Sequence, residues 1–205
     1  MPRRNPPRGR ERSVFLNIPY DAGFQRLYLA YIAGISAFGL VPRATLEIPT
    51  SERRLDRIIA LIDECAYSIH DLSRVQLDRK APITPRFNMP FELGLAVARN
   101  SPHGRQRWYV CESLRRRVNK SLSDLDGTEV HIHEGTLLGL FAALSDIFVR
   151  RRSQPSVQQM YAIYRAISGS LPTILRAAGT RDPYRPRVFR DLVIGARAAQ
   201  PERIR

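Results

Sequence analysis

The feature that most constrains the fold of this chain is a regular alternation between two kinds of apolar pattern. Short runs of β-forming residues, typical of buried strands, cover residues 13–18, 40–41 with 44–48, 67–72, 108–111 and 129–133. Stripes of apolar residues three or four positions apart, typical of amphipathic helices, cover residues 24–38, 55–66, 89–99 and 137–149. Strands that alternate with helices form βαβ units, so the pattern predicts an α/β fold with a parallel sheet covered on both faces.

Five strands in this order predict a flavodoxin-like domain over residues 13–149, and such sheets bind ligands beyond the carboxyl ends of their strands. Those ends lead into residues 19–23, 71–87 and 112–126. We expect residues 73–87 to form a long loop because they are polar and contain two prolines. Asn88 is a suitable N-cap for the helix that follows, and residues 49–51 predict a turn with N-cap candidates.

The two ends of the chain carry almost all of its net charge of +14. Residues 1–12 contain five Arg, one Glu and three Pro, which predicts a flexible basic arm. Residues 150–205 contain twelve Arg against three acidic residues, together with a helical apolar stripe and a short apolar piece at 188–196. We interpret this segment as a basic helical extension that packs on the core or on a second subunit. The stripe comprises Val157, Met160, Tyr161, Tyr164, Ile167 and Leu171, and it favours a homo-oligomer.

Several functional classes lack the sequence signals that they require. No apolar run reaches the roughly 18–20 residues of a membrane span, and the N-terminus has charge without the apolar stretch of a signal peptide, so we expect a cytoplasmic protein that does not bind membranes. Cys65 and Cys111 lie in apolar segments without metal-ligand spacing, which predicts two reduced core residues and no metal site. The chain has no P-loop, GxGxxG or GxSxG motif, which disfavours ATPase, dehydrogenase and α/β-hydrolase functions.

Polar side chains near the predicted strand ends are the candidate functional residues. Glu92 lies in the first turn of the predicted helix 89–99, where it either serves a ligand or only stabilises the helix dipole. Gly94 costs about 1 kcal/mol inside a helix, which predicts that it permits close approach of a neighbouring backbone or ligand. Asp71 ends the third strand, and Tyr20 and Asp21 follow the first. The topology therefore predicts that Tyr20, Asp71 and Glu92 line one pocket, although Asp71 is also a common turn former and Tyr20 an ordinary packing residue.

Three segments stand out together: VFLNIPYD at residues 14–21, IHDLS at 69–73 and FELGLA at 91–96. In this order they resemble the nucleoside 2-deoxyribosyltransferase family and its TIR-like relatives, over roughly residues 13–149. The resemblance implies that Glu92 is the nucleophile and that Asp71 contacts the nucleobase or the sugar. The chain departs from the transferases a few positions before this glutamate, where they carry an acid and this sequence has Asn88 as the nearest polar residue. Hydrolysis or simple binding therefore fits this chain better than transfer between two bases.

The implied reaction cleaves the C1′–N bond between a sugar and a base. Its transition state is oxocarbenium-like, and a carboxylate close to C1′, here Glu92, stabilises or attacks it. Asp71 or Asp21 would protonate the departing base if burial raised its pKa toward neutrality. The other expected binding residues are aromatic, polar, basic or small: Tyr20, Phe24, Ser73, Arg74, Arg86, Phe87, Asn88 and Gly94. The two arginines suit a phosphorylated substrate, NAD contains the same bond type, and no metal or bound cofactor is required.

Three functions remain open at this point. The first is an N-glycosidase or deoxyribosyltransferase that acts on a nucleoside, a nucleotide or NAD. The second is a catalytically silent TIR-like signalling module that binds a nucleotide and uses its tail to contact a protein partner. The third is a nucleic-acid-associated protein that uses its basic termini, since residues 13–149 are nearly neutral. Arg outnumbers Lys thirty-one to two, which a codon bias toward Arg would also produce.

Overall fold

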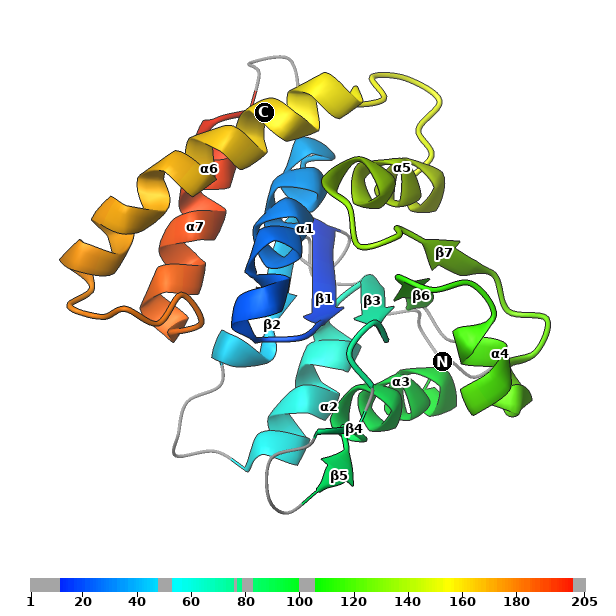
Figure 1. The fold of residues 1–205 in the computed structure, drawn as a ribbon. Coiled ribbons are helices and arrows are strands. Elements are labelled where there is room, and N and C mark those ends of the chain that lie inside the picture. The colour runs from blue at the N-terminus through cyan, green and yellow to red at the C-terminus, as the bar shows by residue number, and fades with distance from the viewer. Residues whose placement is uncertain (1–11, 48–52, 76, 79–82, 100–105, 201–205) are drawn as a thin grey trace, which may run out of the picture.

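The protein is built around a five-stranded parallel sheet, seen in a computed structural model that describes residues 12–47, 53–75, 77–78, 83–99 and 106–200. The strand order is β2-β1-β3-β6-β7 (Figure 1). The strands are β1 (Ser13–Asn17), β2 (Val41–Ala44), β3 (Tyr67–Asp71), β6 (Arg107–Glu112) and β7 (Val130–Ile132). The order changes direction at β1 and β3, as in flavodoxin-like sheets, so the predicted fold class is confirmed.

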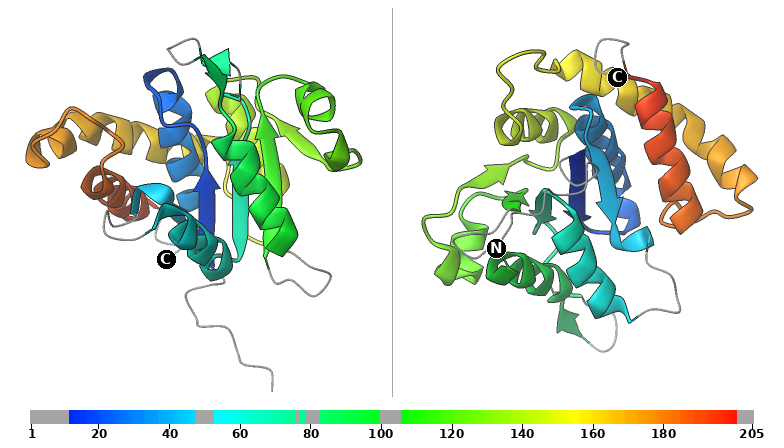
Figure 2. Two further views of the ribbon diagram at one scale, coloured as in Figure 1. Left: turned by 90° about the horizontal axis from the view of Figure 1, so that it is seen from below. Right: turned by 180° about the vertical axis from the view of Figure 1, so that it is seen from behind.

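Helices cover both faces of this sheet (Figure 2). Helices α1 (Gln25–Ala37) and α5 (Leu137–Ile147) lie on one side, which we call the α1 face. Helices α2 (Arg54–Glu64) and α3 (Asn88–Arg99) lie on the other side, which we call the α3 face. Successive side chains of a strand point to opposite faces, so Leu16 packs on the α1 face whereas Phe15 packs on the α3 face.

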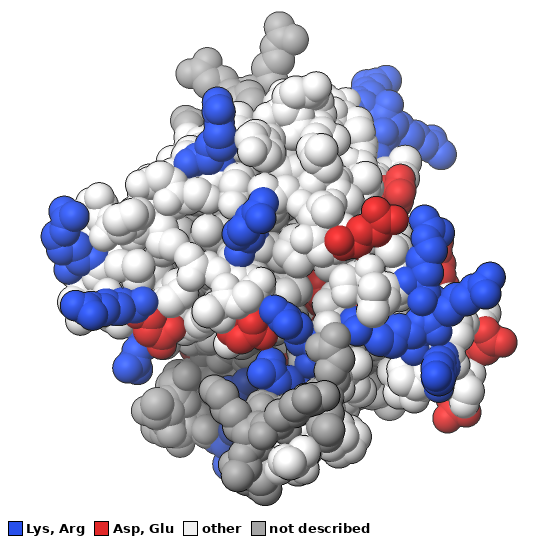
Figure 3. Space-filling model, in the orientation of Figure 1, with Lys and Arg blue, Asp and Glu red and all other residues white. Residues whose placement is uncertain are grey.

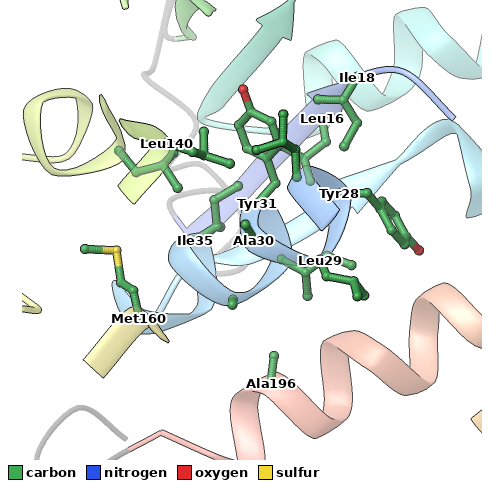
Figure 4. Packing of buried hydrophobic residues seen from close by; sticks show 14 of the residues in the cluster. Leu16, Ile18, Tyr28, Leu29, Ala30, Tyr31, Ile35, Leu140, Met160 and Ala196 are labelled. Carbon is green, nitrogen blue, oxygen red and sulfur yellow. The ribbon is translucent and has the colours of Figure 1, made fainter. Parts of the chain in front are cut away.

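Helix α1 is buried almost all round because it is covered on two sides. Eleven of its thirteen residues are buried, from Leu27 to Ala37. The sheet covers one side of α1, and helices α6 (Val157–Ala177) and α7 (Pro186–Ala198) cover the other. In Figure 4, Ile35 lies between Leu140 of α5 and Met160 of α6. A helix that is apolar all round needs such cover, so the C-terminal helices complete the main core.

Helix α6 explains the apolar stripe that was expected to mediate self-association. The helix begins with a capping box in which Ser156 and Gln159 each bind the other's backbone N–H. Met160 and Ile167 are buried in the core cluster of the same chain, whereas Tyr161 stays 39% exposed. Intramolecular packing therefore accounts for the stripe, and the use of this face for self-association is not supported. Self-association of the protein stays a prediction, but the apolar stripe of α6 no longer supports it.

The second strand is shorter than predicted. It ends at Ala44 because the chain then forms a 3-10 turn, η3 (Thr45–Glu47). The Ala44 N–H donates to the Glu47 carboxylate at 2.9 Å, and Arg43 donates to the same carboxylate at 2.8 Å. Residues 1–11 of the predicted arm and the predicted turn at 49–51 lie outside the described residues.

Several predicted loops contain short elements, because their hydrogen bonds are local and leave little periodic signal. A 3-10 turn, η2 (Ala22–Phe24), precedes α1, and an antiparallel pair, β4 (Leu77–Asp78) and β5 (Thr84–Pro85), lies within the loop after β3. The segment after β6 forms α4 (Arg117–Ser121) and the 3-10 turn η4 (Ser123–Leu125), and residues 188–196 belong to the longer helix α7. Both cysteines are buried, as predicted, and they form no disulfide within the described residues. No helix in the described ranges is long and apolar enough to cross a membrane.

Candidate functional site

Glu92 is a buried carboxylate near the start of α3, at the edge where the sheet strands end. Helix α3 begins at Asn88, so Glu92 occupies the second helical turn. The prediction that it lies in the first turn is wrong by one residue at the start of the helix. Asn88 is itself helical, and the Phe87 carbonyl accepts the N–H of Phe91, so Asn88 is not the N-cap. The side chain is 4% exposed, and no hydrogen-bond donor to it is found among the described residues. Burial raises the pKa of Glu92 to about 7, against an opposing effect of the Arg54 charge.

Tyr20 lies within the electrostatic reach of Glu92. Burial raises the pKa of Tyr20, a hydrogen bond with Thr45 lowers it, and the Glu92 charge raises it further. Its hydroxyl donates to the Leu16 carbonyl at 3.3 Å, which ties the loop back onto β1. Tyr20 and Glu92 are therefore near enough to interact electrostatically, and both also feel the charge of Arg54 of α2, which the sequence analysis did not single out.

Beneath α3, a chain of hydrogen bonds joins the ends of β1 and β3 to the first turn of the helix. The Asn17 amide nitrogen lies 2.9 Å from His70 Nδ1 and 2.9 Å from the Met89 carbonyl oxygen. His70 Nε2 lies 3.0 Å from Ser68 Oγ. Burial lowers the pKa of His70 to about 3, so this imidazole is neutral at physiological pH. Asn17 and His70 belong to the segments VFLNIPYD and IHDLS noted in the sequence, but no sequence signal indicated that their side chains bind each other.

Asp71 lies at the same edge of the sheet but on the α1 face. One carboxylate oxygen accepts the Tyr31 hydroxyl at 2.7 Å and lies 3.1 Å from His133 Nε2. The other accepts the Ser73 N–H at 2.9 Å, and the whole side chain is buried. His70 and Asp71 are neighbours along β3, so they point to opposite faces. Asp71 therefore does not contact Glu92 as expected, because the Asp71 side chain points to the α1 face whereas Glu92 belongs to α3 on the other face.

Ser73, His133 and Asp71 resemble a catalytic triad in composition but not in proton arrangement. Ser73 Oγ lies 3.0 Å from His133 Nε2, the same nitrogen that faces Asp71. His133 Nδ1 accepts the Gly135 N–H at 3.0 Å, so the neutral ring carries its proton on Nε2. A protonated Nε2 cannot take the proton of Ser73. The cluster therefore holds the ends of β3 and β7 together instead of activating the serine.

Asp21, in the loop after β1, joins two arginines of the loop after β3 at the outer rim of the site. Its carboxylate lies 3.4 Å from Arg74 and 3.2 Å from Arg86, and all three side chains are partly exposed. The Arg74 guanidinium lies over Gly23, where an added Cβ would come within 2.2 Å of it. These three predicted residues are therefore brought together, and a glycine at position 23 leaves room for the arginine.

The remaining predicted residues lie in very different environments. Phe24 is buried and stacks on Tyr31 at 6.4 Å between ring centroids, so it belongs to the core. Phe87 is 67% exposed, and Asn88 is exposed beside it. Gly94 is exposed, and an added Cβ would meet nothing within 4 Å, so the prediction that it provides clearance is wrong. The buried residues of α3 are spaced three and four positions apart, and this spacing leaves position 94 on the exposed side.

An arginine that the sequence analysis missed fastens the neighbouring strand end. Arg117 forms a two-pronged ion pair with the buried carboxylate of Glu112 and also donates to the Ser73 carbonyl at 2.8 Å. It therefore links the loop after β6 to the loop after β3. Figure 3 shows other basic side chains gathered around α4, where Arg115, Arg116 and Lys120 are exposed.

No protein-family model matches this chain, and no curated protein matches it either. Within the described ranges, no group of three or more His, Cys, Asp or Glu side chains is arranged to hold a metal ion. The geometry around Glu92 therefore carries the functional argument.

Proposed function

We propose that this protein cleaves the N-glycosidic bond of a nucleoside, a nucleotide or NAD, and that Glu92 carries the reaction. The observation behind this proposal is a carboxylate that is 4% exposed and receives no hydrogen bond within the described part of the chain. Burying a carboxylate without hydrogen-bond donors is unfavourable for folding, and the charge of Arg54 offsets this cost only in part, so such a group calls for a functional explanation. Its position at the carboxyl edge of a parallel sheet is where ligands bind in this architecture.

The chemistry follows from placing C1′ of the sugar against Glu92. The C1′–N bond breaks, its electron pair leaves with the base nitrogen, and positive charge develops on C1′. An ionised carboxylate in a poorly solvated site stabilises this charge strongly, or bonds to C1′ to form a glycosyl ester. Water then adds its oxygen to C1′ and gives up a proton, and where the ester has formed, its C1′–O bond breaks and returns the electron pair to the Glu92 carboxylate. A neutral base takes up a proton as it leaves, whereas the cationic nicotinamide of NAD leaves as a neutral molecule without one.

One feature at the rim of the site supports a nucleotide as the substrate. Stacking of a base or sugar on Tyr20 stays a prediction, because the Tyr20 ring contacts Tyr28 and Tyr184. Arg74 and Arg86 converge on the Asp21 carboxylate at the rim, and a substrate phosphate would compete with that carboxylate for the same guanidinium groups. The role of Asp71 as proton donor to the base stays a prediction, and both of its oxygens are engaged in the resting network.

The direct test is to incubate the protein with NAD, AMP, dAMP, adenosine and deoxyadenosine, and to measure released base by chromatography. We expect at least one of these compounds to be cleaved, and Glu92→Gln to abolish that cleavage. Glu129→Gln is the matched control, because Glu129 is an exposed glutamate on the surface. Equal cleavage by Glu92→Gln and the parent would refute the assignment of Glu92. Nucleotide binding without cleavage by either protein would replace this proposal with a silent nucleotide-binding module.

A further inference from the structure

Asn17 presents a fixed hydrogen-bond acceptor at the carboxyl end of β1. The side chain is 4% exposed, and its amide nitrogen donates to the Met89 carbonyl at 2.9 Å. A carbonyl oxygen can only accept, so the nitrogen and not the oxygen of the amide must face α3. The orientation of the amide group is therefore set by the helix itself.

The contact with His70 supports the same orientation. The second amide hydrogen of Asn17 points to His70 Nδ1 at 2.9 Å, and the proton on His70 Nε2 points to Ser68 Oγ at 3.0 Å. Because the Met89 carbonyl fixes the position of the amide nitrogen, His70 Nδ1 must be the acceptor of this contact, and the ring hydrogen lies on Nε2. Both donors of Asn17 are thus used, while no donor to its Oδ1 is found in the described part of the chain.

Asn17 Oδ1 lies near Glu92. In an α-helix the carbonyl of residue i accepts the N–H of residue i+4, so the Met89 carbonyl lies beside the backbone of Leu93. Glu92 is the adjacent residue, and Met89 and Glu92 are three positions apart on the same side of α3. Asn17 therefore contacts the helix within one turn of the Glu92 side chain.

We propose that Asn17 Oδ1 accepts a hydrogen bond from the 2′-hydroxyl of the substrate sugar, which makes ribosides, and not 2′-deoxyribosides, the preferred substrates. The inference rests on the proposed function, because it takes Glu92 to lie against C1′. The 2′-hydroxyl is bound to the sugar carbon next to C1′. Among the substrate's donors it is therefore the nearest to Asn17 Oδ1. An acceptor held by two bonds needs no reorganisation on binding. A deoxyriboside would leave it buried and unpaired, which typically weakens binding by about 10–100-fold.

Binding to a protein that cannot turn over the ligand is the cleanest measurement, because ribosides and deoxyribosides differ in intrinsic reactivity. We would use Glu92→Gln and titrate AMP against dAMP by calorimetry. AMP is expected to bind about 10–100-fold more tightly than dAMP. Equal affinity for the two nucleotides would overturn the inference, and this comparison needs no substitution at Asn17.

Substitution of Asn17 separates recognition from a merely structural role. In the Glu92→Gln background, Asn17→Ala should reduce the affinity for AMP to that for dAMP and leave dAMP binding unchanged. If Asn17 only positioned α3, both affinities would fall together and the preference would survive, which would refute the assignment. Asn119→Ala is the matched control, because Asn119 is an exposed asparagine that contacts Asp126.

The cleavage experiments keep this inference apart from the proposed function. Cleavage of AMP and dAMP with equal binding would retain the glycosidic mechanism and reject the role of Asn17. Tight, selective binding of AMP with no cleavage of any compound would support the role of Asn17 and reject the chemistry at Glu92.

Discussion

Asp71 and Glu92 lie at the same edge of the sheet, yet their surroundings are opposite. Asp71 faces α1, and its two oxygens lie within hydrogen-bond distance of Tyr31, Ser73 and His133. Glu92 faces away from that network, and the described residues offer it no hydrogen bond. Both side chains are buried, so burial alone does not distinguish their roles. The difference in hydrogen bonding gives Asp71 a structural role at the strand ends, and it is the reason why we propose Glu92 as the reactive group.

The largest expected effect is the loss of Asp71. Asp71→Ala would leave the Tyr31 hydroxyl, the Ser73 N–H and the His133 ring without their acceptor, and it would open a small cavity. Orphaned buried donors together with a cavity predict a loss of about 3–5 kcal/mol in unfolding free energy. Chemical denaturation would measure it. An Asp71→Ala protein as stable as the parent would remove the structural role that this comparison gives to Asp71.

Glu92→Gln should increase the stability of the protein, and the size of this increase should depend on pH. The Glu92 pKa is about 7 in the folded protein, against an ordinary value of 4.5. Between these values the folded state holds a proton that the unfolded state has lost, so stability falls as the pH rises through 4.5 to 7. Glutamine does not titrate and avoids this loss, which is worth up to about 3 kcal/mol above pH 7.

Denaturation at several pH values would measure this gain. The advantage of Glu92→Gln over the parent should grow as the pH rises from 4.5 to 7 and stay constant above it. Glu129→Gln, on the surface, should show no such trend. A constant difference between parent and Glu92→Gln across this range would contradict the burial of an unpartnered carboxylate.

The activity of the parent protein should follow the ionisation of Glu92. If the ionised carboxylate acts on C1′, kcat/KM rises about tenfold per pH unit below the pKa of about 7 and levels off above it. Two units below the pKa, about one hundredth of the plateau rate remains. A profile that fell above pH 7 would make Glu92 a proton donor and not a nucleophile or charge stabiliser.

The smallest expected effect compares two glycines, one in α3 and one in α5. Gly94 lies on the exposed side of α3, and an added Cβ meets nothing within 4 Å, so Gly94→Ala should stabilise the protein by about 0.5–1 kcal/mol. At Gly139 of α5 an added Cβ would lie 2.3 Å from the His133 backbone oxygen, so Gly139→Ala should destabilise it. Thermal unfolding would compare the two. Changes of the same sign would contradict the difference in packing.

Much of the fold followed from local patterns in the sequence. Short apolar runs predicted the five strands, because both faces of a parallel sheet are covered, and apolar stripes with three-to-four spacing predicted the core helices. The same reasoning identified α3 and Glu92 as part of the ligand-binding edge. Short elements such as η3 and α4 were not predicted. A few hydrogen bonds, such as that of Glu47 with Ala44, stabilise them, and their apolar residues show no regular spacing.

The sequence by itself determined the order of the elements, the parallel sheet and the candidate carboxylates. Only the tertiary structure decided what those carboxylates contact. Tyr31 and Asp71 are forty positions apart, and Asn17 and Met89 seventy-two, so their hydrogen bonds depend on which helix crosses which face of the sheet. No local pattern carries that information, since the energy of such a contact belongs to both partners and exists only after the chain has folded.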